Sequence, residues 1–286
     1  MRTALLGAGG QLAYDLKRVL ADWDLRPFTH AELDICHHDR VRQVLTELAP
    51  EVVINCAAYV RVDDAEDEVE EAFRVNAFAV RNLAQVCRDL GCMLVHISTD
   101  YVFDGKKGTP YTEDDCPNPL NVYGASKLAG ENFVRNLCPK HLVIRSSGLY
   151  GVAGSSGKGG NFVETMIRLG QKGKAIRVVD DQVFAPTSTR ELARLVKGIL
   201  LSGVYGTFHL TSQGESSWYE FAGRLFELLG RPVPLSRTTT RDFGARARRP
   251  AFSVLRSIRL SDLGLHEIPP WDVCLADYLR ETAAPV

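Results

Sequence analysis

Three residues whose side chains can hold or move a proton lie within a short stretch of the sequence, and they are Thr99, Tyr123 and Lys127. Tyr123 and Lys127 are four residues apart, so on a helix they project from the same face about one turn apart. A phenol titrates at about pH 10 when unperturbed, and a neighbouring ammonium lowers that pKa toward neutral pH. Such a pair suits proton donation to a carbonyl oxygen while another group delivers hydride, and Thr99 offers a second hydrogen bond to that oxygen.

The Tyr–Lys spacing alone is not specific, because a packed tyrosine beside a surface lysine on a helix has the same pattern. The elements around the pair carry more information. The pair opens a helical pattern that runs to residue 137, and Thr99 follows the apolar run 92–98. The sequence therefore predicts a strand, a long connection and a helix that together position the three side chains.

A glycine-rich turn near the N-terminus indicates a dinucleotide site. Residues 3–7 form a short apolar run that Gly7 closes, and a helical pattern follows it. Glycines at 7, 9 and 10 let the backbone approach a pyrophosphate, and the helix N-terminus supplies N–H groups. Asp34 lies 24 residues beyond Gly10, where an acidic group often binds the ribose end of a dinucleotide, although a solvated loop aspartate fits equally well.

Apolar strands alternate with helical patterns over the first two-thirds of the chain, which predicts a doubly wound parallel sheet with right-handed crossovers. The runs typical of buried strands are 25–28, 51–55, 92–98 and 141–145. The carboxyl ends of such strands share one edge, so the glycine turn, the small residues of CAAY (56–59) and Thr99 should converge on one cleft. A helical stretch over about 66–90 has Asn76 in its interior, and asparagine is a mediocre helix former, so this residue either has a function or faces solvent.

The later part of the chain is less regular. Residues 146–162 contain six glycines and four serines, which is typical of a long mobile loop and compatible with a flap over a substrate. Further helices are expected at 162–173, 188–201, 216–230 and near 271–282, and strands at 175–179 and 206–211. Arg246, Arg248 and Arg249 could clamp a diphosphate or belong to a solvated basic loop.

Composition narrows the class of protein. The 286 residues carry a net charge of −1, so no electrostatic footprint for nucleic acid or for an anionic membrane is present. No apolar run reaches the length of a membrane span, and the seven cysteines form no CxxC pair. We expect a cytoplasmic protein with reduced thiols and no metal site.

The motifs taken together resemble the dTDP-4-dehydrorhamnose reductase family of the extended short-chain dehydrogenase/reductases. The likeness covers essentially the whole chain, and its most specific parts are HISTDYVFDG and NVYGASKLAGE. GAGGQL, LDI, INCAAYVRVDDAE, GGNFVETM, DDQVFAPT and ARRPAFSVL resemble the family's other blocks in the same order. The resemblance implies an α/β fold, Rossmann-like, with a smaller, mostly C-terminal substrate-binding subdomain.

The resemblance also implies roles for individual residues. Tyr123 would donate the proton, Lys127 would tune it and hold the nicotinamide ribose, and Thr99 would polarise the substrate carbonyl. NADPH or NADH would lie against Gly7, Gly10, Gln11, Leu12, Asp34, Ile35, Ala57, Ala58, Tyr59, Asn76, Tyr123 and Lys127. A dTDP-sugar would lie against Asp100, Tyr101, Asn161, Phe162, Gln182 and Arg249.

The implied reaction is hydride transfer to the C4 keto group of a dTDP-6-deoxy-hexulose, giving dTDP-L-rhamnose. We expect an NAD(P)-binding domain over 1–148, to which 185–212 return, and a substrate-binding subdomain over 149–184 and 213–286. A homodimer is possible, since the family has metal-assisted dimers; Asp15 falls near one acidic position of that interface, and no metal is inferred from it.

Three positions depart from the family pattern. Gly148 stands where a tryptophan is common, so an aromatic wall of the sugar pocket is missing, and Phe184 stands where a glycine is usual. Val60 and Arg61 replace small polar residues near the cofactor. The reductase chemistry is thus better supported than the exact substrate. The alternatives are a related sugar-nucleotide reductase, epimerase or dehydratase, and a non-catalytic regulatory subunit on the same scaffold.

Overall fold

The computed structural model describes residues 1–153 and 159–282. Its centre is a six-stranded sheet in the order β10-β5-β4-β3-β1-β2, in which all neighbouring strands are parallel. The strands are β1 (Arg2–Leu6), β2 (Asp24–Phe28), β3 (Val52–Asn55), β4 (Met93–Thr99), β5 (His141–Ser146) and β10 (Gly206–His209). The strand order reverses between β1 and β3, the point at which open α/β sheets bind ligands.

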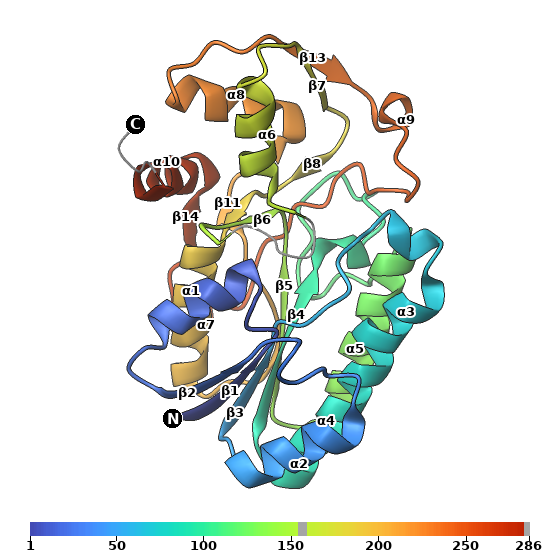
Figure 1. Ribbon diagram of the computed structural model, residues 1–286, viewed down its shortest axis with the longest axis vertical. Coiled ribbons are helices and arrows are strands. Elements are labelled where there is room, and N and C mark those ends of the chain that lie inside the picture. Colours follow the sequence, from blue (N-terminus) through green and yellow to red (C-terminus); the bar gives the residue numbers. More distant parts are fainter. Residues whose placement is uncertain (154–158, 283–286) are drawn as a thin grey trace.

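Helices cover both faces of this sheet (Figure 1). On one face lie α1 (Gln11–Val19) and α7 (Thr189–Ser202), and on the other lie α2 (His38–Leu48), α4 (Val80–Leu90) and α5 (Val122–Leu137). The Rossmann-like fold expected from the sequence is therefore confirmed. The helix α2 was not expected, although its apolar residues Val41, Val44, Leu45 and Leu48 recur at helical spacing and Val41 and Leu45 are buried.

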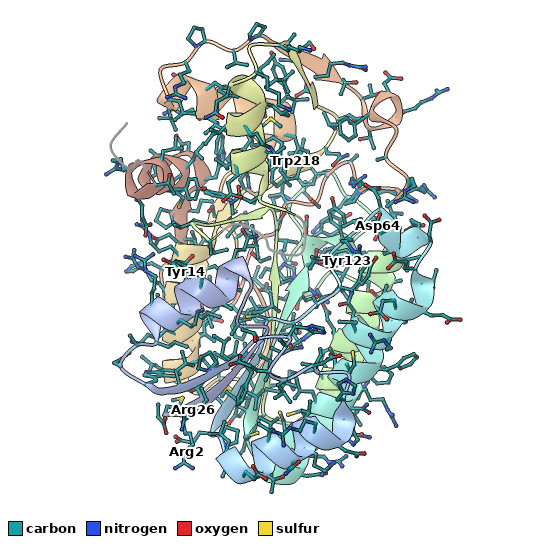
Figure 2. The ribbon with its side chains drawn as sticks, in the orientation of Figure 1. Arg2, Tyr14, Arg26, Asp64, Tyr123 and Trp218 are labelled. Atoms are coloured by element: carbon teal, nitrogen blue, oxygen red, sulfur yellow. The ribbon has the colours of Figure 1, made fainter. Side chains whose placement is uncertain are left out.

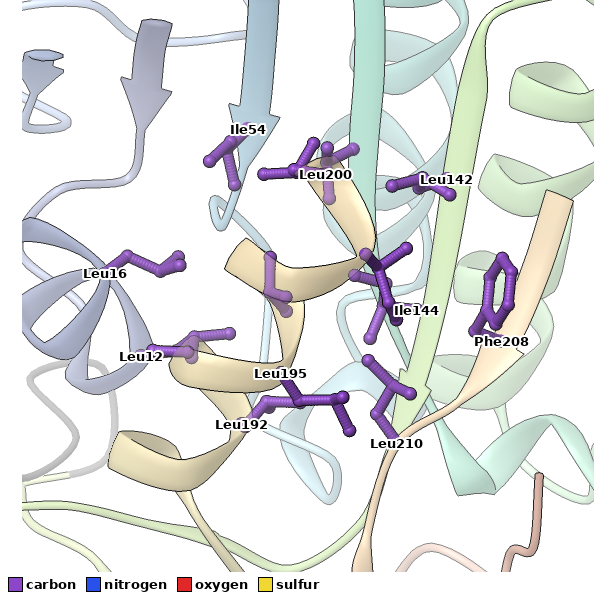
Figure 3. Packing of buried hydrophobic residues seen from close by; sticks show 14 of the residues in the cluster. Leu12, Leu16, Ile54, Leu142, Ile144, Leu192, Leu195, Leu200, Phe208 and Leu210 are labelled. Atoms are coloured by element: carbon purple, nitrogen blue, oxygen red, sulfur yellow. The ribbon is translucent and has the colours of Figure 1, made fainter. Parts of the chain in front are cut away.

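The period-2 alternation of strand side chains explains why both faces are apolar. Leu5, Ile54 and Ile144 point to the cluster that α1 and α7 complete, while Ala4 and Val53 point to the cluster under α2 and α4. Figure 3 shows the first cluster, where Leu12 and Leu16 from α1 meet side chains of the strands and of α7. This buried core fixes the sheet edge on which the site is built.

The segment expected as one helix over 66–90 is divided. A 3₁₀ turn (Asp64–Glu66) precedes α3 (Val69–Phe73), and a π-helical turn (Arg74–Ala79) leads into α4. The π turn packs against α5 at Gly130, where a Cβ would lie 2.2 Å from the carbonyl oxygen of Asn76. Such turns are frequent at functional sites, and here the turn holds Asn76 in the interior of the protein.

A third apolar cluster belongs to the elements that Figure 1 draws above the carboxyl edge of the sheet. It includes Tyr150, Phe184 and Phe221. Its buried members come from segments between Tyr150 and Tyr278 that are far apart in the sequence. Short strand pairs connect these segments, β7 with β13 in parallel and β8 with β12 antiparallel. The elements of this part are β6 (Leu149–Tyr150), α6 (Phe162–Gly170), β7 (Ile176–Val179), β8 (Val183–Phe184), β9 (Thr187–Ser188), β11 (Ser212–Gln213), β12 (Ser216–Ser217), α8 (Trp218–Leu228), β13 (Leu235–Thr238), α9 (Thr240–Phe243), a 3₁₀ turn (Ser261–Leu263), β14 (Ile268–Pro270) and α10 (Trp271–Thr282).

The glycine-rich stretch 146–162 is more ordered at its ends than a mobile loop would be. β6 lies at its start, and Asn161 caps α6 with a reciprocal capping box to Glu164 at its end. Its centre, 154–158, lies outside the described residues, and so does the flap expected there. In the part of the chain that the structure describes, no helix combines the length and the apolar character needed to cross a membrane.

Candidate active site

Two clefts lie at the carboxyl edge of the sheet and meet at Tyr123. We call the first, of about 440 Å³, the glycine cleft because Gly7, Gly9 and Gly10 line it. We call the second, of about 350 Å³, the aromatic cleft because it is lined by Phe162, Phe184, Trp218 and Phe221. Both clefts are lined by Gln11, Val60, Ser98, Tyr123 and Leu149. A ligand in either cleft would therefore reach the same phenol.

The turn that begins the glycine cleft is shaped for close approach of a ligand to backbone. Gly7 has φ +73°, and a Cβ on it would lie 2.6 Å from the backbone nitrogen of Ala57, so only glycine fits there. Gly10 is the N-cap of α1 and brings no side chain to the first turn. The buried Gln11 Oε1, at the junction of the clefts, accepts no hydrogen bond. These features fit a dinucleotide whose pyrophosphate lies at the helix N-terminus and whose nicotinamide end reaches Gln11.

All but one of the residues expected to hold a dinucleotide line the glycine cleft, and the exception is Asn76. The Asn76 side chain accepts from the backbone N–H of Tyr59 at 2.9 Å and donates to the Tyr59 carbonyl and to Ser126 Oγ, each at 3.0 Å. Its amide is thus engaged within the protein, and a direct contact of Asn76 with the cofactor stays a prediction. Asn76 supports the cleft by holding the backbone of Tyr59.

The far end of the glycine cleft carries charges of both signs. Asp34 accepts from the Cys36 N–H at 2.9 Å and lies 3.5 Å from His30 Nε2, and these neighbours hold its pKa below the usual range against the opposing effect of burial. Arg74, which the sequence reasoning missed, lines the same end with its guanidinium on Glu71 at 2.7 Å. Arg74 lies on the π turn, far from the glycines in sequence, so no local sequence pattern indicated that it would line this cleft. This end can meet a ribose hydroxyl through Asp34 or a phosphate through Arg74.

Tyr123 stands on the first turn of α5, and this turn is tightly fixed. Asn121 caps the helix by accepting from the Gly124 N–H at 2.7 Å. A Cβ at Gly124 would lie 2.2 Å from the carbonyl oxygen of Tyr101, so the helix start is pressed against the segment that follows β4. The Tyr101 and Tyr123 rings meet edge to face at 6.0 Å. Figure 2 shows Tyr123 between the sheet and the part of the molecule that contains Trp218.

The expected effect of Lys127 on the Tyr123 pKa is not found. Burial raises the pKa of Tyr123 above its ordinary value, opposed by a hydrogen bond with the Thr99 side chain. The Lys127 ammonium lies deeper, donating to the Ile97 carbonyl at 2.6 Å and lying 3.2 Å from His96 Nε2. Burial lowers the pKa of Lys127 to about 8. The phenol is accordingly held in its protonated form, the form of a proton donor.

A buried carboxylate fixes the third member of the set. Thr99 donates to Asp100 Oδ1 at 3.1 Å and accepts from the Tyr101 N–H at 3.1 Å. Asp100 Oδ2 accepts from Ser147 at 2.8 Å and from Ser253 at 2.5 Å. Burial raises the pKa of Asp100, and these three hydroxyl donors oppose that rise. Asp100 thus lies beneath the aromatic cleft and orients the Thr99 hydroxyl beside the phenol.

Ser98, between the two clefts, was also missed although it directly precedes Thr99. Its hydroxyl donates to Glu131 Oε1 at 2.5 Å, and Glu131 forms a fully buried ion pair with Arg145 at 2.6 Å. Arg145 in turn lies 3.3 Å from His209 Nε2. This network ties the ends of β4, β5 and β10 to α5 next to Thr99.

The aromatic cleft explains two departures from the family pattern. Gly148 has φ +54°, and a Cβ there would lie 2.3 Å from Cε2 of Phe184. Phe184 is buried and stacks on Trp218 with ring centroids 3.9 Å apart. Trp218 in turn donates from Nε1 to Gln182 Oε1 at 3.2 Å. The Phe184 ring therefore occupies the space of a side chain at position 148, and the wall is aromatic although residue 148 is glycine.

Five of the six residues expected to bind the sugar nucleotide line this cleft, and the exception is Arg249. Its guanidinium donates to Asp63 Oδ2 at 2.8 Å, and Pro250 lines the cleft in its place. Arg246 pairs with Asp64 and Asp67 instead. The Arg246 and Arg249 guanidinium groups therefore hold the 63–67 loop in this structure, and a diphosphate clamp by the three arginines stays a prediction. The third arginine contributes its backbone, since the Arg248 carbonyl accepts from Asn121 at 2.7 Å.

The third departure lies on the opposite rim. Val60 lines both clefts, so it places an apolar side chain where cofactor and substrate would meet. Arg61 turns away, with its guanidinium on Glu68 at 3.2 Å and 5.1 Å from the Tyr59 ring centroid. The replacement at position 61 therefore changes the outer rim of the clefts and not the residues that line them.

Comparison with known proteins gives a consistent result. The model of the RmlD substrate binding domain matches residues 1–284. The dTDP-4-dehydrorhamnose reductase of Sinorhizobium fredii is 37% identical over 95% of this chain and 94% of its own, and the dTDP-4-keto-6-deoxy-D-glucose reductase of Streptomyces niveus is 38% identical over 96% and 95%. The crystal structure of the Bacillus anthracis dTDP-4-dehydrorhamnose reductase in complex with NADP superposes with a TM-score of 0.94, at 40% identity over 98% of this chain and 99% of that one.

Proposed function

The chain belongs to the RmlD substrate-binding domain family, whose relatives here are NAD(P)-dependent dTDP-sugar 4-keto reductases, and we propose that it reduces dTDP-4-dehydrorhamnose to dTDP-L-rhamnose. The observation that carries the proposal is the place of Tyr123, at the point where the glycine cleft and the aromatic cleft meet. A carbonyl carbon in the aromatic cleft would there face a nicotinamide in the glycine cleft. A non-catalytic role would not require a buried phenol and hydroxyl at that junction.

In the proposed reaction the cofactor supplies hydride to C4 of the sugar. The protein's own part is to position the carbonyl and to supply the proton. Tyr123 donates its phenolic proton to the C4 oxygen, and the Thr99 hydroxyl, turned from Asp100, donates a second hydrogen bond. Lys127 holds the ribose side of the glycine cleft, and only in its charged form does it favour the phenolate that forms. The rings of Phe184 and Trp218 pack against the sugar and exclude water from it.

The proposed binding roles follow the two clefts. The cofactor is NADPH or NADH, and the pair of Asp34 and Arg74 supports trying both, because each favours a different adenosine ribose. The sugar nucleotide lies against Asp100, Tyr101, Asn161, Phe162 and Gln182, with Arg249 acting through Asp63. We further propose that 1–148 with 185–212 forms the cofactor domain and that 149–184 with 213–286 forms the substrate domain. The separate apolar cluster of the second part supports this division.

A second candidate reaction is reduction of the unepimerised sugar, dTDP-4-keto-6-deoxy-D-glucose. The relative from Streptomyces niveus favours it, and so does the changed wall at Gly148 and Phe184. Both reactions use the same hydride and proton transfer. They differ only in the configuration of the ring that the aromatic cleft must accept.

One experiment separates these candidates. Oxidation of NADPH and of NADH is followed at 340 nm with substrate made in situ, either by the 4,6-dehydratase alone or by dehydratase plus epimerase. Turnover only with the epimerase, with dTDP-L-rhamnose as product, supports the main proposal. Equal turnover without the epimerase supports the second candidate. Absence of turnover in both, with a protein that binds the cofactor, would contradict both, and light scattering on the same sample tests for a homodimer.

A further inference from the structure

Behind Lys127 lies a row of buried polar side chains that the proposed reaction does not use. Lys127 Nζ is 3.2 Å from His96 Nε2, and His96 Nδ1 is 3.3 Å from Asn55 Nδ2. Asn55, His96 and Lys127 are each at most 2% exposed. They come from the end of β3, the middle of β4 and α5, so three elements of the fold meet in this row.

The contacts of Asn55 determine which group donates and which accepts in each hydrogen bond of the row. The Ala57 N–H donates to Asn55 Oδ1 at 3.1 Å, so the amide oxygen is occupied and the NH₂ group faces His96. An amide NH₂ only donates, hence His96 Nδ1 must accept. A neutral imidazole that accepts at Nδ1 carries its proton on Nε2. The ring is held neutral, because burial lowers the pKa of His96 well below its ordinary value.

The Nε2–H group of His96 therefore points at Lys127 Nζ. An ammonium has three donors and no acceptor, whereas a neutral amine can accept this hydrogen with its lone pair. The amine can still donate to the Ile97 carbonyl, which lies 2.6 Å from Nζ. Geometry thus favours the neutral form of Lys127, in agreement with the direction in which burial moves its pKa.

We propose that Asn55 and His96 are positioning residues for Lys127: the Asn55 amide fixes the His96 tautomer, and the ring then disfavours the ammonium form of the lysine. Only the catalytic consequence, an alkaline limit to activity set by this row, rests on the proposed function. The tautomer itself is a property of the protein without substrate. An experiment can therefore contradict the His96 tautomer without contradicting the proposed function, and the reverse.

Other titratable groups also lie around Lys127. Glu131 on the next turn of α5 favours the ammonium, but it is shared with Arg145 and Ser98. Cys56, after β3, also favours the ammonium, and the raised pKa of its thiol keeps it uncharged near neutral pH. Tyr123, one turn earlier on α5, has a raised pKa and is uncharged too. The buried His96 ring is the group that opposes the charge through a hydrogen bond.

The direct test is ¹⁵N NMR of the full chain labelled at histidine, without cofactor or substrate. The His96 resonances are identified by their loss in His96→Leu, and His141→Asn serves as the matched control because His141 lies at the opposite, N-terminal end of β5. The expected result is a neutral ring protonated at Nε2 from pH 6 to 9. A ring protonated at Nδ1, or a charged ring, would overturn the proposal.

A second test uses the sign of a shift. The ¹³Cε resonance of Lys127, identified by its loss in Lys127→Arg, is titrated in the parent protein and in His96→Leu. Removal of a ring that opposes the charge should move the midpoint up by about one pH unit, whereas removal of a ring that accepts from the ammonium would move it down. In Asn55→Asp the acceptor at position 55 should convert His96 to the Nδ1–H tautomer. If that tautomer does not change, the amide does not fix the ring.

Discussion

The glycine cleft and the aromatic cleft share Tyr123 but differ in what holds their walls. Beneath the glycine cleft, Asn55, His96 and Lys127 form a row in which each hydrogen bond fixes the direction of the next. In the aromatic cleft, Phe184 and Trp218 hold the wall by packing, and the space of a side chain at 148 is filled from another strand. A hydrogen-bonded row tolerates little change, because one lost partner leaves a buried polar group unsatisfied. In a packed wall, a larger side chain at one position can compensate for a smaller one at another. The substrate specificity can therefore change while the reaction chemistry stays the same.

The largest expected effect is at the shared residue. Tyr123→Phe removes the proposed proton donor and keeps the ring, so kcat should fall by about 10² to 10⁴, the usual contribution of a general acid. Binding of NADPH, measured by fluorescence, should remain close to that of the parent because the glycine cleft is intact. A variant that turns over at the parent rate would show that the two clefts do not share a catalytic residue.

The next effect tests whether the aromatic wall is set by volume. Gly148→Ala places a Cβ 2.3 Å from the Phe184 ring, and we expect KM for the sugar nucleotide to rise about 10- to 100-fold, the range of a misfitted methyl-sized group. Adding Phe184→Leu should restore part of the loss, and the double-mutant cycle measures the coupling.

Gly203→Ala is the matched control for that exchange. Gly203 has φ +71°, close to the left-handed conformation of Gly148, but a Cβ there meets no atom within 4 Å. Both variants should lose about 1–2 kcal/mol of stability from backbone strain. If Gly203→Ala raised KM as much as Gly148→Ala does, strain and not the lost volume would be the cause.

The same contrast explains what could be predicted from the sequence. The sheet and the glycine turn were predictable because buried strands are continuous apolar runs and the turn needs small residues. Tyr123 and Lys127 were predictable from their spacing only together with the elements around them and the family resemblance of NVYGASKLAGE. The raised pKa of Tyr123 was not, because burial depends on how α5 packs against the segment after β4, which no local pattern encodes.

Other parts of the site were beyond a sequence argument for a similar reason. Asn76 was placed in the cofactor cleft, but a π turn brings its amide to the Tyr59 backbone, and π turns have no clear sequence signal. Trp218 was seen only as part of a helix, since its contact with Phe184 joins strands and helices that are far apart in the sequence. The arginines after residue 245 fitted a diphosphate clamp and a solvated basic loop equally well from the sequence, because the acidic partners of Arg246 and Arg249 lie about 180 residues earlier.

A third prediction concerns pH, which should affect the polar network under the glycine cleft more than the aromatic wall. Burial lowers the folded-state pKa of His209 to about 4, and that of His96 well below its ordinary value. The unfolded chain therefore binds protons that the native state does not, so stability is full above about pH 6.5 and is lost as pH falls below it. The loss should be about 1.4 kcal/mol per pH unit for each ring. Urea unfolding between pH 7 and 5 measures it.

Two variants make that prediction specific. His209→Gln removes one of the rings whose pKa burial lowers, and should reduce the slope of stability against pH. Phe184→Leu should lower the free energy of unfolding by a similar amount at both pH values, because no charge changes in the aromatic wall. A slope that is unchanged in His209→Gln would mean that other groups bind the protons.

The smallest expected effect is at the outer rim of the aromatic cleft, where Arg246 pairs with Asp64 and Asp67. Arg246 is about half exposed, and solvent-exposed ion pairs contribute below about 1 kcal/mol. Arg246→Ala should therefore change KM less than about twofold and leave the unfolding curve nearly unchanged. Arg249→Ala is the informative partner, because the Arg249 side chain is only 18% exposed and its ion pair with Asp63 lies next to the cleft lining at Pro250. It should raise KM for the sugar nucleotide more than Arg246→Ala does. Equal effects of the two variants, or a large effect of Arg246→Ala alone, would indicate that the diphosphate of the substrate binds at the rim. The aromatic wall would then not be the main determinant of substrate binding.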